Sequence, residues 1–140
     1  INRGRGEVVD NKALLDALDK GKLAEAIIDT WENAPAISRE LLEKVYIGTP
    51  HIAGYSADGK ANGTRMSLQW IAQWLNRQDI FLSMTVKAPS LPDSITPPDD
   101  QAERQLLLYN PKDDSKRLKD NPDGFEFQRG NYPLRRESFD

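Results

Sequence analysis

Short apolar runs alternate with amphipathic segments along the first half of the chain. Residues 23–28 and 45–47 are apolar and short enough for buried strands, and residues 1–2 resemble the end of another strand. Between these runs, leucines recur at helical spacing over residues 11–20 and 38–45. The order strand, helix, strand, helix, strand predicts a parallel sheet with right-handed crossovers.

Both expected helices have recognisable ends. Asp10 and Ser38 are N-cap residues, whose side-chain oxygens can accept a hydrogen bond from the first helical turn. Gly21 follows the first helix and can adopt the left-handed conformation that ends a helix. In the second helix, Leu41 and Leu42 are expected to face the core.

The pattern changes after the third apolar run. Residues 49–63 are polar and contain several glycines and prolines, which predicts a loop. Helical spacing returns over residues 64–76, where Trp70 and Trp74 lie one turn apart. Such a pair more often packs into a core than stacks on a cofactor, so we expect both tryptophans to be buried.

Proline and serine become frequent near the middle of the chain, and we interpret residues 83–98 as a linker. This divides the chain into an α/β part over residues 1–82 and a smaller part over residues 99–140. The smaller part is expected to contain three short helices, over residues 99–108, 112–120 and 125–132.

Composition narrows the function classes. The 140 residues include no cysteine, carry a formal net charge of −3, and are 38% hydrophobic. Without cysteine there is no disulfide framework and no thiolate metal site, and the scattered lysines and arginines give no electrostatic footprint for nucleic acid. No apolar run approaches the length that spans a bilayer. We therefore expect a cytoplasmic protein that binds neither nucleic acid nor a membrane.

Three side chains with different chemistry follow the expected strands. Arg5 lies between two glycines after the first strand, Asp29 follows the second, and His51 comes shortly after the third. Because the carboxyl ends of parallel strands meet at one edge of a sheet, we expect the three side chains to converge there. Guanidinium grips a carboxylate through two hydrogen bonds, and histidine titrates near neutrality. The combination suggests redox or proton-transfer chemistry on an anionic substrate.

Each candidate residue also has a structural interpretation. Arg5 could be an exposed arginine in an ordinary turn, Asp29 a cap or a surface acid, and a single histidine is more often structural than catalytic. Tyr55 and Gly54 share the loop of His51: the tyrosine could hydrogen-bond to a substrate, and the glycine could let the backbone approach a cofactor. Both could equally be ordinary loop residues. The sequence contains no metal-ligand spacing, nucleophile elbow or phosphate loop.

Three motifs together resemble the NAD-dependent D-isomer specific 2-hydroxyacid dehydrogenases. They are Arg-Gly-Glu-Val-Val-Asp-Asn-Lys-Ala-Leu-Leu at residues 5–15, Asp-Thr-Trp-Glu at residues 29–32, and Ile-Gly-Thr-Pro-His-Ile-Ala-Gly-Tyr-Ser at residues 47–56. Residues 59–64 and 129–136 are similar to the branch of this family that oxidises a small phosphorylated hydroxy acid in vitamin B6 biosynthesis.

The resemblance implies a fold and partners. The fold would be α/β, comprising the C-terminal half of a Rossmann-type parallel-sheet NAD-binding domain and part of a small α+β dimerisation domain. The cofactor would be NAD, the substrate a small phosphorylated hydroxy acid, and the intact protein a homodimer.

The resemblance also implies residue roles. Arg5 matches the arginine that orients the substrate, and His51 matches the acid/base that takes the hydroxyl proton as hydride leaves for nicotinamide. Asp29 and Gly54 match contacts to NAD, and Tyr55 matches a contact to the substrate. The implied reaction converts a 2-hydroxy acid to a 2-oxo acid.

The chain departs from the family pattern in two places. The family pairs its histidine with a glutamate directly before a proline, and here Ala34 occupies that position; Glu32 corresponds to a different one. Since a carboxylate partner orients the imidazole, we expect slower turnover. The glycine-rich pyrophosphate turn is also missing, and we interpret Ile1 and Asp140 as cuts through a larger protein. We therefore expect weak NAD binding and no turnover from this chain alone.

Two alternatives stay open from the sequence. One is another D-2-hydroxyacid dehydrogenase, against which residues 55–56 and 109–114 argue. The other is a non-catalytic truncated or degenerate remnant, which Ala34 and the missing turn favour.

Overall fold

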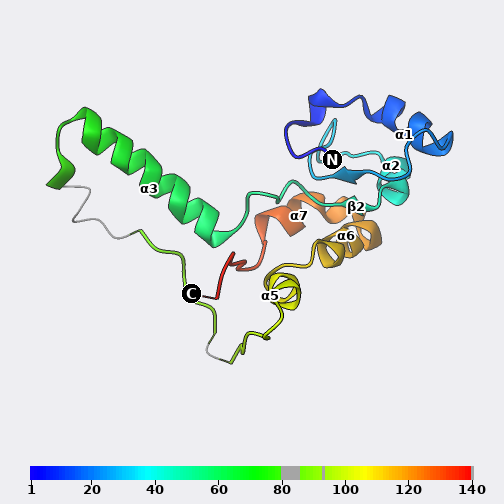
Figure 1. The fold of residues 1–140 in the computed structure, drawn as a ribbon. Helices are drawn as coiled ribbons and strands as arrows, with labels where there is room; N and C mark the ends of the chain where they lie inside the picture. Colours follow the sequence, from blue (N-terminus) through cyan, green and yellow to red (C-terminus); the bar gives the residue numbers. More distant parts are fainter. Residues whose placement is uncertain (80–85, 93, 140) are drawn as a thin grey trace. The chain divides into compact units, whose positions relative to one another are not determined.

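A computed structural model describes residues 1–79, 86–92 and 94–139 (Figure 1). The chain divides into two units. Unit 1 comprises Ile1–Ala53 and Asn110–Pro133, and unit 2 comprises Gly54–Tyr109 and Leu134–Asp140. This division differs from the one expected from the sequence, because part of the C-terminal segment joins the first 53 residues. The expected boundary between residues 82 and 83 lies outside the described residues.

The helices of unit 1 are the 3-10 helix η1 (Gly6–Val8), α1 (Asn11–Asp19), α2 (Arg39–Lys44), α6 (Pro111–Asp120), the 3-10 helix η2 (Pro122–Gly124) and α7 (Phe125–Gly130). The helices described for unit 2 are α3 (Ala57–Trp74) and α5 (Gln101–Leu108).

A small parallel sheet lies at the centre of unit 1. Strands β1 (Ile27–Ile28) and β2 (Ile47–Gly48) are parallel. Asn2 adds a further parallel bridge to Ile28. The expected parallel pairing is thus confirmed. Strand β1 is shorter than the apolar run of residues 23–28 that predicted it, and Leu23 within that run is exposed.

The helix ends of unit 1 follow the local sequence signals. The Asp10 side chain accepts a hydrogen bond from the Ala13 amide at 2.9 Å, and Ser38 Oγ accepts one from the Leu41 amide at 3.1 Å. Gly21 has a φ of 64°, the left-handed conformation that glycine adopts without steric cost. Both predicted caps are therefore confirmed.

The hydrophobic core of unit 1 combines distant parts of the chain. Leu41 and Leu42 of α2 are fully buried, and they share one cluster with Ile28, Leu118 and Phe125. Burying such a side chain contributes roughly 1.5–3 kcal/mol. Residues 110–133 therefore complete the core that the first 53 residues begin.

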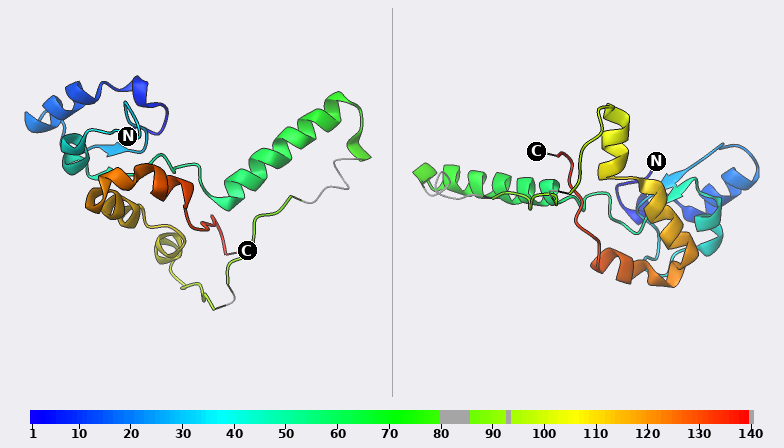
Figure 2. Two further views of the ribbon diagram at one scale, coloured as in Figure 1. Left: turned by 180° about the vertical axis from the view of Figure 1, so that it is seen from behind. Right: turned by 90° about the horizontal axis from the view of Figure 1, so that it is seen from below.

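Helix α6 packs against β2, as the views in Figures 1 and 2 agree. Ser115 Oγ accepts a hydrogen bond from the Gly48 amide at 3.0 Å in a buried position. A side chain at Gly48 would lie 2.7 Å from Leu42 Cδ1 and 2.9 Å from Trp31 Cζ2. Only glycine fits at this position of the strand, and its own amide is satisfied by the serine of α6.

Helix α3 begins earlier than expected. Ser56 Oγ accepts a hydrogen bond from the Gly59 amide at 3.0 Å and so caps a helix over Ala57–Trp74. The expectation of a loop over residues 49–63 is therefore wrong from residue 57 onward. The cap offsets the low helix propensity of the two glycines in this stretch, Gly59 and Gly63.

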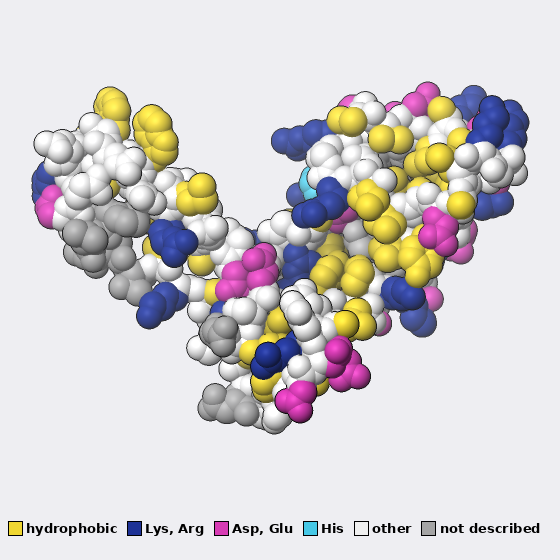
Figure 3. All heavy atoms as spheres, in the orientation of Figure 1, with side chains coloured by type: hydrophobic (Ala, Val, Ile, Leu, Met, Phe, Trp, Pro, Cys, Tyr) yellow, Lys and Arg dark blue, Asp and Glu magenta, His cyan; other side chains and the backbone are white. Residues whose placement is uncertain are grey.

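The expected burial of the two tryptophans of α3 is also wrong. Trp70 is 71% exposed and Trp74 is 77% exposed, and Ala72 alone is buried among the residues of this helix. Hydrophobic side chains accordingly stand out on the surface over α3 in Figure 3. The helical period correctly identified an apolar stripe, but a period does not specify what packs on it.

The remainder of unit 2 follows the expected pattern more closely. In the stretch expected to be a linker, residues 86–92 and 94–98 form neither helix nor strand. Helix α5 then begins after Asp100, whose side chain accepts a hydrogen bond from the Glu103 amide at 2.9 Å. None of the helices within the described ranges combines the length and apolar character that crossing a bilayer requires.

The C-terminal segment of unit 2 is bonded to the first turn of α3. Asp58 accepts hydrogen bonds from Arg136 Nε at 2.9 Å and from the Glu137 amide at 2.7 Å. Arg136 also donates to the Pro89 carbonyl oxygen at 2.8 Å. The hydrogen bond from this guanidinium holds the pKa of Asp58 below its ordinary value.

Replacing Asp58 by asparagine should destabilise unit 2 in a pH-dependent way. Because the folded pKa is below the ordinary value of 3.8, the carboxylate stabilises the fold above that pH and loses its contribution as the pH falls through the folded value. We expect Asp58→Asn to lower the free energy of unfolding by about 0.5–1 kcal/mol near neutral pH, and by almost nothing at about pH 2. Urea unfolding, with exchange of the Glu137 amide as a local probe, measures both.

Asp99→Asn is the matched control, because it changes an exposed aspartate of the same unit. It should alter neither quantity. An effect of Asp58→Asn that is equally large at both pH values would contradict an electrostatic origin.

Candidate active site

A cleft of about 340 Å³ in unit 1 is lined by both side chains expected to carry the chemistry, Arg5 and His51. Gly6 and Glu7 contribute to one side of it, and residues 30–34, which follow β1, contribute most of the remainder. The structure thus brings the arginine and the histidine to one cavity at the carboxyl ends of parallel strands, where open α/β folds bind ligands.

Hydrogen bonds from the Asn2 side chain hold the turn that carries Arg5. The side-chain Nδ2 of Asn2 donates to the Arg5 carbonyl oxygen at 3.1 Å and to the Thr30 carbonyl oxygen at 3.2 Å. A side chain at Gly6 would clash with the Trp31 carbonyl, so the turn can lie against the segment that follows β1 only with glycine here. Sequence reasoning missed Asn2, because a single asparagine next to a strand carries no signal of its own.

The loop that carries His51 is fixed by Asp29. Its carboxylate is buried and accepts hydrogen bonds from Thr49 Oγ1 at 2.7 Å, from the Ile52 amide at 2.8 Å and from the Ala53 amide at 3.1 Å. Asp29 is not among the residues that line the cleft. The convergence expected from the sequence therefore holds for Arg5 and His51 in this cleft but does not include Asp29, whose contact to NAD stays a prediction.

The backbone of His51 is left-handed, with a φ of 56°. This conformation is uncommon for a residue with a side chain and costs on the order of 1 kcal/mol, so the surroundings must impose it. The Thr49 carbonyl oxygen accepts hydrogen bonds from the His51 amide at 3.0 Å and from Trp31 Nε1 at 2.9 Å. The indole is buried, and it ties the histidine loop to the end of β1.

Ala34 lines the cleft together with His51. The wall therefore presents a methyl group at the position where the resemblance leads us to expect a carboxylate. Glu32 does not replace it, because its Oε2 accepts a hydrogen bond from the Asn11 amide at 2.8 Å, at the start of α1. A carboxylate at a helix N-terminus is stabilised there by the peptide dipoles.

The stretch of chain that forms this cleft matches a known protein family. Residues 1–53 match the family described as D-isomer specific 2-hydroxyacid dehydrogenase, NAD binding domain. This part of the chain is therefore similar to that family. The match covers Arg5, Asp29 and His51, and its description supports NAD as the cofactor expected from the sequence.

Relatives extend the similarity to nearly the whole chain. An erythronate-4-phosphate dehydrogenase of Bacteroides thetaiotaomicron is 54% identical over 137 residues, which cover 98% of this chain and 38% of that protein. Proteins of the same name from Bacteroides fragilis and Porphyromonas gingivalis are 49% and 42% identical over the same shares. The chain thus spans about two fifths of the length of these relatives.

Gly54 and Tyr55 begin unit 2. A side chain built at Gly54 would meet no atom within 4 Å, so no packing contact in the structure requires glycine there. The Tyr55 ring lies under Lys60, with Nζ 4.3 Å from the ring centroid. The contact of Gly54 with NAD and the contact of Tyr55 with the substrate stay predictions.

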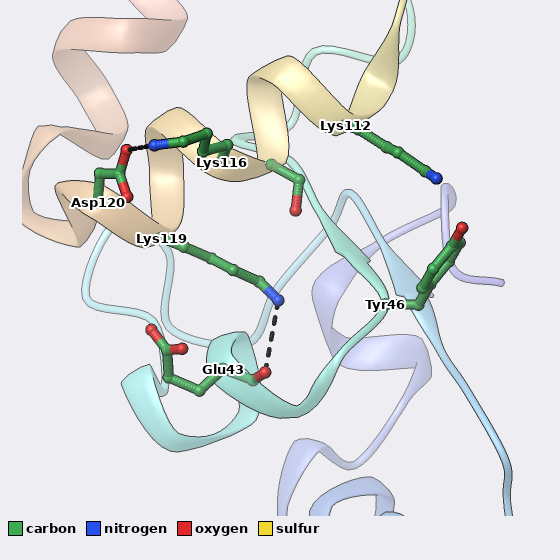
Figure 4. A pocket seen from close by; sticks show the side chains of 7 residues that line it. Glu43, Tyr46, Lys112, Lys116, Lys119 and Asp120 are labelled. Atoms are coloured by element: carbon green, nitrogen blue, oxygen red, sulfur yellow. Dashed lines mark hydrogen bonds and ion pairs between the residues drawn. The ribbon is translucent and has the colours of Figure 1, made fainter.

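A second pocket of unit 1, of about 500 Å³, is rich in lysine (Figure 4). Each of its lysines has a partner within the chain, and one pKa is affected: the hydrogen bond with the Tyr46 phenol raises the pKa of Lys112. The ammonium groups of this pocket are thus already engaged within the chain, and no group of residues in the described ranges has metal-ligand character. The pairs are Lys116 with Asp120, Lys119 with the carbonyls of Glu43 and Val45, and Lys112 with Tyr46.

Proposed function

We propose that this chain is part of an NAD-dependent dehydrogenase that oxidises the 2-hydroxyl of 4-phospho-D-erythronate to a 2-oxo acid, a step of pyridoxal phosphate biosynthesis. The observation that carries the proposal is the shared cleft of Arg5 and His51 in a stretch that matches the family's NAD-binding domain. The names of the relatives support the substrate.

The proposed mechanism assigns one task to each side chain. The Arg5 guanidinium holds the substrate carboxylate through two parallel hydrogen bonds and so orients the carbon that bears the hydroxyl. The neutral His51 imidazole takes the hydroxyl proton while the carbon–oxygen double bond forms. NAD, when bound, supplies the acceptor for the hydride that leaves this carbon.

We propose further contacts to cofactor, substrate and partner subunit. Asp29 and Gly54 contact NAD: Oδ2 of the carboxylate accepts a hydrogen bond from the Ala53 amide, next to the loop of His51, and the glycine leaves open space beside its backbone. Tyr55 contacts the substrate, and residues 99–140 contribute to a homodimer.

A second candidate function is a non-catalytic remnant, favoured by the methyl group of Ala34 in the wall of the cleft. No Gly-x-Gly-x-x-Gly sequence occurs among the 140 residues, so the phosphate-binding turn of this fold is not encoded in them. We propose that the chain by itself binds NAD more weakly than micromolar and does not turn over, which calorimetric titration with NAD tests directly.

The dehydrogenase proposal can be tested in a chimera in which residues 1–140 replace the matched stretch of the Bacteroides thetaiotaomicron relative. We expect NAD reduction with 4-phospho-D-erythronate, and a loss of kcat of about a hundredfold or more with His51→Gln, because the base is removed. The affinity for NAD should change little. Absorbance of the reduced nicotinamide follows the rate.

Lys116→Gln in the second pocket is the matched control and should leave the rate unchanged. A chimera that folds and binds NAD but shows no turnover would support the remnant instead.

Restoring a glutamate should improve the catalytic site. In the same chimera we expect Ala34→Glu to raise kcat by about tenfold, because a carboxylate beside the imidazole orients it and stabilises its protonated form. Ala34→Gln, which has nearly the same shape without the charge, should give a smaller gain. Equal rates for all three proteins would contradict the assignment of this position.

A further inference from the structure

We infer that Asp29 is a positioning residue for His51, in addition to its proposed contact with NAD. Its carboxylate sets the backbone conformation of the loop that presents the imidazole. The catalytic consequence rests on the proposed function, whereas the effect on the loop does not.

The residues that donate hydrogen bonds to Asp29 lie on both sides of His51 in the sequence. Oδ1 accepts from the hydroxyl of Thr49, two residues before the histidine, and from the amide of Ile52, one residue after it. Oδ2 accepts from the amide of Ala53, the next residue. The three distances, between 2.7 and 3.1 Å, are those of well-formed bonds to a charged acceptor.

Burial makes these bonds obligatory. Asp29 is only 3% exposed, and a carboxylate removed from water is costly unless hydrogen bonds replace its hydration. Its donors, Thr49, Ile52 and Ala53, all belong to the histidine loop. A loop conformation that withdrew these donors would leave a buried charge without compensation, so burial of the carboxylate favours the observed loop.

The backbone conformation of His51 in this loop is one that a histidine rarely adopts without such support. With a φ of 56°, His51 is in the left-handed region, where a residue with a side chain is strained. Its position directs the Ile52 amide toward Oδ1 of Asp29. Ile52 itself is fully buried, which anchors the loop on the far side of the histidine.

The loop can be tested in the 140-residue chain by nuclear magnetic resonance, because His51 is its only histidine. Wild-type protein should show a strong intraresidue Hα–HN contact for His51, the signature of a positive φ, and slow exchange of the Ile52 and Ala53 amides. We expect Asp29→Asn to remove the signature and to speed exchange of both amides about tenfold or more, since a carboxamide presents one acceptor and one donor instead of two acceptors.

Asp16→Asn is the matched control, because it alters an exposed aspartate of α1 in the same unit and should change neither readout. Thr49→Val removes one donor at nearly constant volume, and it decides the matter should Asp29→Asn fail to fold. We expect Thr49→Val to speed the Ile52 and Ala53 exchange severalfold. Unchanged exchange in a folded variant of either kind, or a retained positive φ in Asp29→Asn, overturns the inference.

Kinetics separates positioning from cofactor contact. In the chimera described above, a positioning role predicts that Asp29→Asn lowers kcat at least tenfold at saturating NAD. A raised KM for NAD with unchanged kcat would instead show contact alone and overturn the inference. If the parent chimera does not turn over, the proposed function fails, and the resonance experiment alone decides the role of Asp29 in the loop.

Discussion

The carboxylate of Asp29 is removed from water and obtains its hydrogen bonds from the chain itself. Its donors lie on both sides of His51, so the free energy of burying one charge is linked to the shape of the loop that bears the imidazole. The cleft of unit 1 depends on this link, because the loop otherwise has a left-handed residue and no strand to hold it.

The end of β1 fixes the other side of the cleft as well. The Thr30 carbonyl oxygen accepts the hydrogen bond from Asn2 that holds the Arg5 turn, and Trp31 Nε1 donates to the Thr49 carbonyl oxygen. Asp29, Thr30 and Trp31, which directly follow β1, thus connect the arginine and histidine segments to one strand end. Such a shared scaffold holds the two side chains at one cleft while neither is itself buried in the core.

The sequence predicts features that depend on neighbouring residues. Asp10 and Ser38 cap helices because a cap needs only the first turn, and His51 reaches the cleft because parallel strands end at one edge. Asn2 and Trp70 were not predictable in this way. The first acts through two carbonyls, one of them 28 positions along the chain, and the second presents an apolar face whose covering no periodicity specifies.

Leu118 and Phe125 pack in one core with Leu41 and Leu42, which lie more than seventy positions earlier in the chain. Evolution can therefore alter the volume of either pair only if the other pair compensates, since close-packed interiors tolerate neither voids nor overlap. Correlated substitution between these distant pairs would be the historical trace of that shared space, and any recombination point placed between them would separate partners that have adapted to each other.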